Sequence, residues 1–395
     1  MGGDLARRRV NAWALGIVVE RNYRDRVPTS MTRAQVLRFR VRAQQLDSPV
    51  DRGSVALAET AVLDLGVQDT GPDGGIWALA IRGVDVSALT GDELATAWTI
   101  RGAPHLYRRP EMGSVAAAVA PFSDADAGKR IFDASKPLKA AAIGNLDGLD
   151  AVAKAMRSIV AKPMVKGDVS AAVTARMSAP YLRFCRPCDA THLYEMPFRL
   201  AALRAGLELQ AGTSPPVLQR LPGFKQAKAA SQRHDVVRAY LRLLGPATPK
   251  HVAEYLDAPV KDVKARWPSD ATEVSVTGEQ RWMLADEAEL EPERATGVRL
   301  LGPYDLFLQA RDRTLLVADN SRAKALWPAI GRPGAVLRNA DLAGLWRPRK
   351  SGTKLTVTVE LWAKASAAIR RQVTDQAEVL AAFRGIRLAA VDFGD

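Results

Sequence analysis

The sequence predicts an α+β protein with three tandem winged-helix units followed by a small β-barrel domain. Three observations support this fold class. The chain has 395 residues, too many for one compact core, so several domains are expected. Between Ser231 and Leu284, three short helical patterns precede two β-rich runs, the element order of a winged helix. After Pro292, short β-like runs bounded by Gly, Pro, Asn and Asp become frequent.

The winged-helix pattern is clearest in the third unit. Its first helix has apolar residues at helical spacing and ends at Gly245-Pro246. Thr248-Pro249 is typical of an N-cap followed by proline at the first helical position, and Thr277-Gly278 is typical of a hairpin turn. The expected elements are helices over 236–244, 249–256 and 260–267 and strands over 273–276 and 280–284.

Two earlier stretches have the same plan with less regular patterns. In the second unit, a lead helix ends before Pro163 and is followed by helices over 168–177 and 197–205. In the first unit, Thr32 begins a basic helix, residues 55–63 and 76–81 form further helices, and residues 97–107 are extended. The expected boundaries are 1–135, 136–225 and 226–292 for the winged helices and 293–395 for the barrel.

The last domain is predicted from alternating β patterns. Polar and apolar residues alternate from Thr356 to Glu360, as they do in a half-buried strand. An amphipathic helix over 366–383 precedes an extended tail. The expected strands cover 315–317, 335–338, 342–346 and 355–361.

The composition indicates an intracellular protein that binds a polyanion. Lys and Arg total 56 against 43 Asp and Glu, a net charge of +13. This balance favours nucleic acid as partner, although Arg-rich and Ala-rich usage in high-GC organisms is the alternative explanation. We expect a cytoplasmic, nucleoid-associated monomer, because no apolar run spans a membrane, Met1 to Asp4 starts no secretion signal, and two cysteines suit a reducing compartment.

No metal or cofactor is expected. Cys185 and Cys188 with His192 suggest zinc, but no second Cys pair or spaced His pair supplies a fourth ligand, so buried structural thiols are the preferred interpretation. Glycine-rich phosphate loops and a nucleophile elbow are missing from the sequence, which disfavours kinase, hydride-transfer and α/β-hydrolase chemistry.

Two segments have residues suited to chemistry or binding. The run from Asp64 to Gly74 places Asp64 and Gln68 on one face of either a strand or a helix, with a polar turn as the alternative interpretation. The turn from Trp346 to Lys354 offers an aromatic and cations to a phosphate backbone, with a solvated loop as its alternative. Its candidate DNA-binding residues are Trp346, Arg347, Arg349, Lys350 and Lys354.

With these segments the sequence resembles the AlkZ-like DNA glycosylases. The resemblance extends from about Thr32 to Leu361, and no single motif decides it, but the order and spacing of the motifs are specific. It is carried by Leu65 to Asp69, Trp98 to Leu106, Glu195 to Leu203, Leu301 to Asp305, Arg311 to Arg313 and Gly344 to Arg349.

The resemblance implies a C-shaped molecule around a basic channel and a monofunctional enzyme that excises alkylated purines from duplex DNA, including N7-alkylguanine and crosslinks, without a metal. Gln68 is then the residue that orients the water, Asp69 or Asp64 supplies the second polar group, and Arg101 and His105 line the site. The family's Gln-x-Gln or Gln-x-Asp motif is altered here, because Gly66 occupies its first position. A catalytically inactive protein that recognises lesions is therefore the alternative.

Overall fold

The computed structural model describes residues 29–48, 53–71, 73–284 and 297–394. The elements around residues 236–284 confirm the sequence prediction. Thr248 caps its helix by accepting a hydrogen bond from the His251 backbone N–H, and both residues of the Thr277-Gly278 turn have positive φ. The elements are α9 (Val236–Leu244), α10 (Pro249–Leu256), α11 (Val260–Lys264), β10 (Ala271–Val276) and β11 (Glu279–Leu284).

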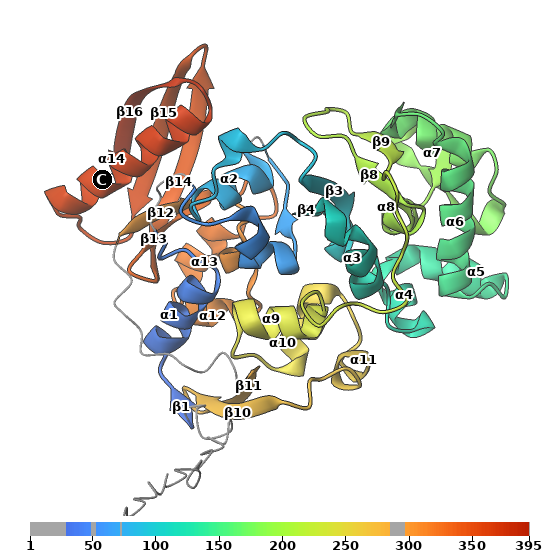
Figure 1. The fold of residues 1–395 in the computed structure, drawn as a ribbon, viewed down its shortest axis with the longest axis horizontal. Coiled ribbons are helices and arrows are strands. Elements are labelled where there is room, and N and C mark those ends of the chain that lie inside the picture. The colour runs from blue at the N-terminus through green and yellow to red at the C-terminus, as the bar shows by residue number, and fades with distance from the viewer. Residues whose placement is uncertain (1–28, 49–52, 72, 285–296, 395) are drawn as a thin grey trace, which may run out of the picture.

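The N-terminal segment belongs spatially to this third unit. β1 (Ser30–Met31) runs parallel to β10 and completes a three-stranded sheet. α1 (Arg33–Ala43) begins at Thr32, whose side chain forms a capping box with Gln35, and it contacts α9 (Figure 1). Pairing between residues some 250 apart could not be inferred from local patterns.

A six-stranded sheet joins the segments assigned to the first and second units. Its strand order is β2-β4-β3-β8-β9-β5, so it continues across the boundary expected at residue 135. The strands are β2 (Val67–Gln68), β3 (Leu94–Trp98), β4 (Pro104–Arg108), β5 (Met164–Val165), β8 (Leu207–Leu209) and β9 (Val217–Arg220).

Helices cover this part of the chain largely as expected. The helix predicted over 55–63 is wrong, because Thr60 is extended and divides the segment into 3-10 turns at Leu57–Glu59 and Ala61–Asp64. The remaining helices are α2 (Gly74–Ala80), α3 (Met112–Val119), α4 (Asp124–Arg130), α5 (Ser135–Ala140), α6 (Asn145–Ile159), α7 (Lys166–Thr174) and α8 (Glu195–Arg204). Between α7 and α8 lies a separate hairpin, β6 (Leu182–Cys185) and β7 (Ala190–Leu193).

The C-terminal domain is an open sheet, so the predicted barrel is wrong. Its strand order is β12-β13-β14-β15-β16, and the edge strands β12 and β16 do not pair within the described residues. α14 (Ala367–Phe383) covers one face and contacts both edge strands, so the face is buried without closure (Figure 1). The strands are β12 (Val298–Leu301), β13 (Gly334–Arg338), β14 (Asp341–Ser351), β15 (Lys354–Leu361) and β16 (Arg387–Gly394).

The strand predicted over 315–317 is also wrong. Leu315 and Leu316 lie in α12 (Arg313–Leu316), followed by α13 (Asn320–Leu326). A short apolar run does not distinguish a buried helix from a buried strand.

One large core connects the N-terminal, third and C-terminal segments, whereas residues 152–218 supply most of a second core. Two buried ion pairs cross the large core: Arg40 with Asp312, and Arg82 with Asp305. They fix α1 and the end of α2 against the loop and turn that follow β12. Within the described residues, none of the helices combines the length and apolar character needed to cross a bilayer.

Candidate active site and nucleic-acid interface

Gln68 lies at the end of β2, where its side chain is half-buried and fixed in orientation. β2 pairs antiparallel with β4, which places Gln68 opposite His105. Its Nε2 donates a hydrogen bond to Thr70 Oγ1 at 3.1 Å. No described residue donates a hydrogen bond to its Oε1, so the carbonyl end of the amide is available to a water or substrate.

A small pocket opens beside Gln68 between the first segment and the C-terminal domain. Gln68, Thr70 and Asp73 form one side, and the loop from Gly302 to Asp305 forms the other. The cavity volume of about 40 Å³ accommodates a water molecule. Two segments more than 200 residues apart thus create a mostly apolar pocket, with a few polar side chains, that neither contains alone.

Gly66, just before β2, packs closely against Tyr107 of β4. Gly66 has φ +91, and a Cβ there would overlap the Tyr107 ring, so the position requires glycine. The Tyr107 hydroxyl lies 2.9 Å from Thr99 Oγ1, which lies 3.0 Å from His105 Nδ1. The Tyr107 ring therefore fills the space that a side chain at position 66 would need, and its hydroxyl belongs to a buried chain of hydrogen-bonding groups.

His105 belongs to this buried chain and does not reach the protein surface, contrary to expectation. Its side chain is 1% exposed. Burial, and secondarily the charge of Arg101, lower the pKa of His105 to about 3, so the imidazole is neutral at physiological pH. Alternation along β4 explains the position, because His105 and Tyr107 share the face opposite Arg108.

Asp69 caps a helix and does not line the pocket. Its Oδ1 accepts a hydrogen bond from the Gly75 backbone N–H at 2.8 Å, at the start of α2. Burial raises the pKa of Asp69, although that hydrogen bond opposes the shift. A Cβ at Gly74 would overlap the Asp69 carboxylate, so the turn and the cap fit each other closely.

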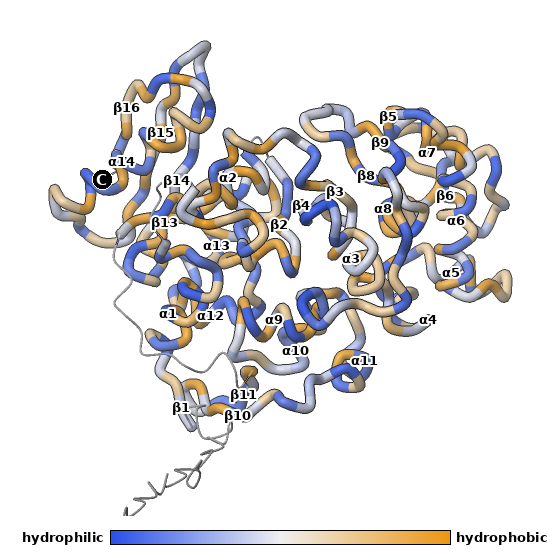
Figure 2. The backbone as a smooth tube through the Cα atoms, in the orientation of Figure 1, coloured by the Kyte–Doolittle hydropathy of each residue, from blue (hydrophilic) through white to orange (hydrophobic). Residues whose placement is uncertain are grey.

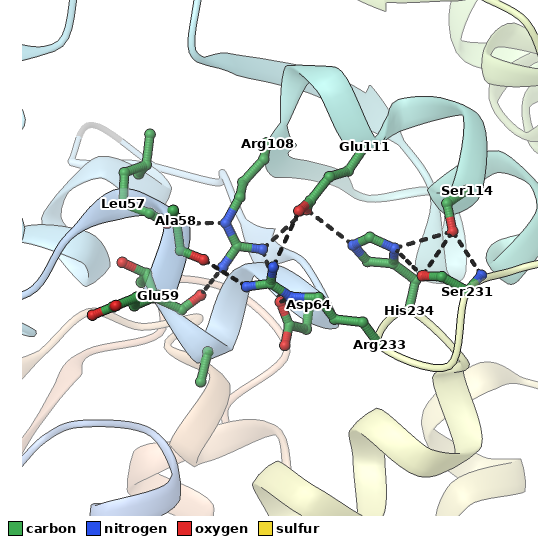
Figure 3. A network of polar contacts seen from close by, with 12 residues as sticks. Leu57, Ala58, Glu59, Asp64, Arg108, Glu111, Ser114, Ser231, Arg233 and His234 are labelled. Carbon is green, nitrogen blue, oxygen red and sulfur yellow. Dashed lines mark hydrogen bonds and ion pairs between the residues drawn. The ribbon is translucent and has the colours of Figure 1, made fainter.

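Asp64 is buried in an ion-pair network on the other face of β4 (Figure 3). Its carboxylate contacts Arg108 at 2.8 Å and Arg233 at 2.7 Å, and Arg242 lies 3.1 Å away. Two of these arginines come from the segment that includes α9. Asp64 therefore joins the first and third segments, and it is not among the residues that line the pocket.

Glu111 extends the same network. It contacts Arg108 at 3.0 Å and His234 Nε2 at 3.0 Å, while His234 Nδ1 lies near Ser114 and Ser231 (Figure 3). Desolvation disfavours the charged form of Glu111, but Arg108 and His234 outweigh it and lower its pKa.

Asp73 is the carboxylate that the sequence analysis missed. It lines the pocket with Gln68, and its side chain is 14% exposed. Arg384, immediately after α14, grips both of its oxygens, with Nε 2.7 Å from Oδ1. Asp73 lies in the polar run after Gln68, which the sequence analysis had singled out. The residue that fixes its carboxylate, Arg384, lies 311 residues away in the chain.

Four arginines, Arg101, Arg311, Arg313 and Arg332, lie close enough to repel one another, and Arg332 lies beside the pocket residue Tyr304. Among the described residues none of the four makes an ion pair with a carboxylate, and the Arg311 Nε is buried without a partner. Burial and repulsion from the other three arginines lower the pKa of Arg313. We call this set the arginine cluster.

Aromatic rings connect the arginine cluster to the pocket. The Arg332 guanidinium lies 5.3 Å from the ring centre of Tyr304, a pocket residue. Arg101 lies 4.8 Å from the Tyr255 ring and donates to the Tyr255 carbonyl and to Gln309. The cations are held in place while their charge remains uncompensated, as an anion-binding surface requires.

The basic hairpin β14–β15 projects from the C-terminal domain (Figure 1), and its end is hydrophilic (Figure 2). Arg347, Arg349, Lys350 and Lys354, the hairpin cations, are exposed. Arg347 donates to the Gly331 carbonyl at 2.7 Å, which ties the hairpin to the loop carrying Arg332. Trp346 is 2% exposed and bonded to the Leu301 carbonyl, so this predicted DNA-binding residue is a core residue instead.

The sequence analysis preferred buried structural thiols at Cys185 and Cys188, and this prediction is wrong. Cys188 is exposed and Cys185 is only partly covered, on the β6–β7 hairpin. A hydrogen bond to His192 is the first of several contacts that lower the pKa of Cys185 to about 7.

Comparisons with known proteins show the family and the fold of the chain. The family model for DNA glycosylase AlkZ-like proteins matches residues 62–383. A solved structure, the DNA glycosylase AlkZ of Streptomyces sahachiroi, superposes with a TM-score of 0.68 at 19% identity, covering 92% of this chain and 100% of that one. No match is found among curated proteins.

Proposed function

The chain belongs to the AlkZ-like DNA glycosylase family, and from this premise we propose that it hydrolyses the N-glycosidic bond of alkylated purines in duplex DNA. The protein is an enzyme that acts on damaged DNA; the lesion class and the residue roles are the proposal. The observation that carries it is a single half-buried amide, Gln68, on a water-sized pocket beside uncompensated arginines.

Gln68 would orient the attacking water. Thr70 holds the Nε2 end of the amide, which directs Oε1 to accept a hydrogen bond from a water in the pocket. An N7-alkylated purine already carries positive charge and leaves without a strong general acid. Positioning of the water and stabilisation of the developing sugar cation are then the main tasks, and both are electrostatic.

Asp73 would supply the carboxylate for which the sequence analysis had considered Asp69 or Asp64. It is the carboxylate that shares the pocket side with Gln68, whereas Asp69 caps α2 and Asp64 is paired with arginines. Its bidentate contact with Arg384 fixes the position of the carboxylate. A fixed negative charge near the sugar stabilises an oxocarbenium-like transition state.

Duplex DNA would bind along the arginine cluster and the hairpin cations. Their guanidinium and ammonium groups suit phosphate oxygens, and the hydrogen bond from Arg347 to Gly331 holds the hairpin next to the loop that carries Arg332. The C-shaped channel formed by three winged helices and a monomeric state are parts of the same proposal.

Excision of N7-methylguanine from a labelled duplex, followed by alkaline strand cleavage, tests the lesion class under single-turnover conditions. Gln68→Ala should reduce the rate about 10²- to 10³-fold, with duplex affinity nearly unchanged. Gln372→Ala, an exposed glutamine on α14, is the matched control and should behave as wild type. Loss of affinity in Gln68→Ala in place of loss of rate would contradict the role of water positioning.

A second set of variants tests whether Asp73 is the carboxylate that takes part in the reaction. Asp73→Asn should lower the rate, whereas Arg384→Met, which removes the same ion pair but keeps the carboxylate, should retain most of it. Asp69→Ala should mainly lower thermal stability by removing the cap of α2. Equal rates for Asp73→Asn and wild type would exclude Asp73 from the reaction.

A further inference from the structure

The tip of the β6–β7 hairpin gathers three side chains that bind transition metals. Cys185 and Cys188 flank one 3-10 turn, Arg186–Cys188, and Asp189 has a left-handed conformation with φ 47. This reversal returns the chain so that His192 pairs with Arg183 on β6 and lies on the same face of the hairpin as Cys185. Ligand atoms of the two cysteines and the histidine lie within 4.8 Å of one another.

The histidine is held in the form that a metal requires. Its Nδ1 lies 2.8 Å from the Leu193 carbonyl, which can only accept, so Nδ1 carries the proton. The lone pair is then on Nε2. Metal-ligating histidines characteristically donate their other N–H to a backbone carbonyl in this way, which fixes the ring and its tautomer.

The hairpin has little other means of stabilising its tip. β6 has no buried residue, and in β7 only Leu193 is buried. Phe184, which directly precedes Cys185 on β6, is 60% exposed. The base of the hairpin packs on the second core through Leu182 and Leu193. The tip has no such packing, so a bound metal ion would supply stability there that side-chain packing does not.

We propose that Cys185, Cys188 and His192 bind one Zn²⁺, with a water as fourth ligand, and that the ion stabilises the β6–β7 hairpin. Two thiolates and an imidazole form a donor set that suits zinc, and three protein ligands plus water complete a tetrahedron. Binding releases the thiol protons to solvent. This site is independent of the pocket at Gln68, and excision does not require it.

The test uses the full-length chain, purified under reducing conditions and stripped of metal. Titration with Co²⁺ should give the visible bands of tetrahedral cobalt and thiolate-to-cobalt charge transfer, saturating at one ion per chain. Zn²⁺ should displace the Co²⁺ and increase hydrogen-exchange protection of the β6–β7 amides. Cys188→Ser and His192→Ala should weaken binding by at least about tenfold, while Phe184→Ala, on the same hairpin, should bind as wild type.

Circular dichroism checks that each variant is folded. No cobalt spectrum with wild-type protein, or equal affinity in Cys188→Ser, would overturn the proposal. A Cys185–Cys188 disulfide that forms readily, together with failure of the reduced chain to bind Co²⁺ or Zn²⁺, would also overturn it and identify a thiol–disulfide pair instead.

Discussion

Asp64→Asn distinguishes a structural carboxylate from a catalytic one. The Asp64 and Arg108 side chains are each 7% exposed, so neutralising Asp64 removes charge compensation from a buried guanidinium. Removal of one partner of a buried ion pair costs about 3–5 kcal/mol. Glu111 still contacts Arg108, and Arg233 is 40% exposed, so we expect the lower end, about 3 kcal/mol.

This loss is large enough to measure. About 3 kcal/mol corresponds to roughly a hundredfold fall in the ratio of folded to unfolded protein. Urea unfolding followed by fluorescence should show a lower midpoint for Asp64→Asn. Asp270→Asn is the matched control, because Asp270 is 49% exposed and pairs with Arg238 at the surface, where the expected cost is about 0–1 kcal/mol.

Excision measured well below the unfolding temperature should be nearly normal in Asp64→Asn. The reasoning would be refuted if Asp64→Asn unfolded at the same urea concentration as Asp270→Asn but lost excision. In that case Asp64 would act in the reaction, and the network in Figure 3 would contribute little to stability.

Three further predictions follow from the same surfaces and cores. Neutralising Arg347, Arg349 and Lys350 should lower the logarithmic salt slope of duplex binding by up to about three, and an unchanged slope would remove the hairpin from the interface. Gly66→Ala should destabilise the protein by about 1–3 kcal/mol and slow excision, because it strains the backbone and displaces Tyr107; normal stability and rate in thermal and kinetic assays would contradict this. The pKa of His105 is about 3 when folded and near 6.5 when unfolded, so between these values the unfolded chain binds the extra proton and stability falls on acidification. The stability of wild type relative to His105→Asn should thus decrease by about 2 kcal/mol from pH 7 to pH 5, and a constant difference in urea unfolding would exclude a neutral buried imidazole.

Local sequence patterns determined many of the helices and strands. The caps at Thr32 and Thr248 and the turn at Thr277-Gly278 depend on neighbouring residues, so they could be predicted from a short window. The alternation in β15 was recognisable for the same reason. The strand expected over 315–317 failed because a short apolar run fits either a helix or a strand. The helix expected over 55–63 failed because the extended Thr60 divides that segment into two 3-10 turns.

In the candidate site, too, some features follow from the local sequence and others depend on tertiary contacts. The sequence alone identified Gln68, the basic hairpin and the family resemblance, since these depend on residue type and order. Tertiary structure decided that Asp73 and not Asp69 faces the pocket, that His105 and Trp346 are buried, and that Arg332 lies beside Tyr304. These contacts join residues far apart in the chain, and the energy of burial and charge pairing that fixes them exists only once the segments have packed together.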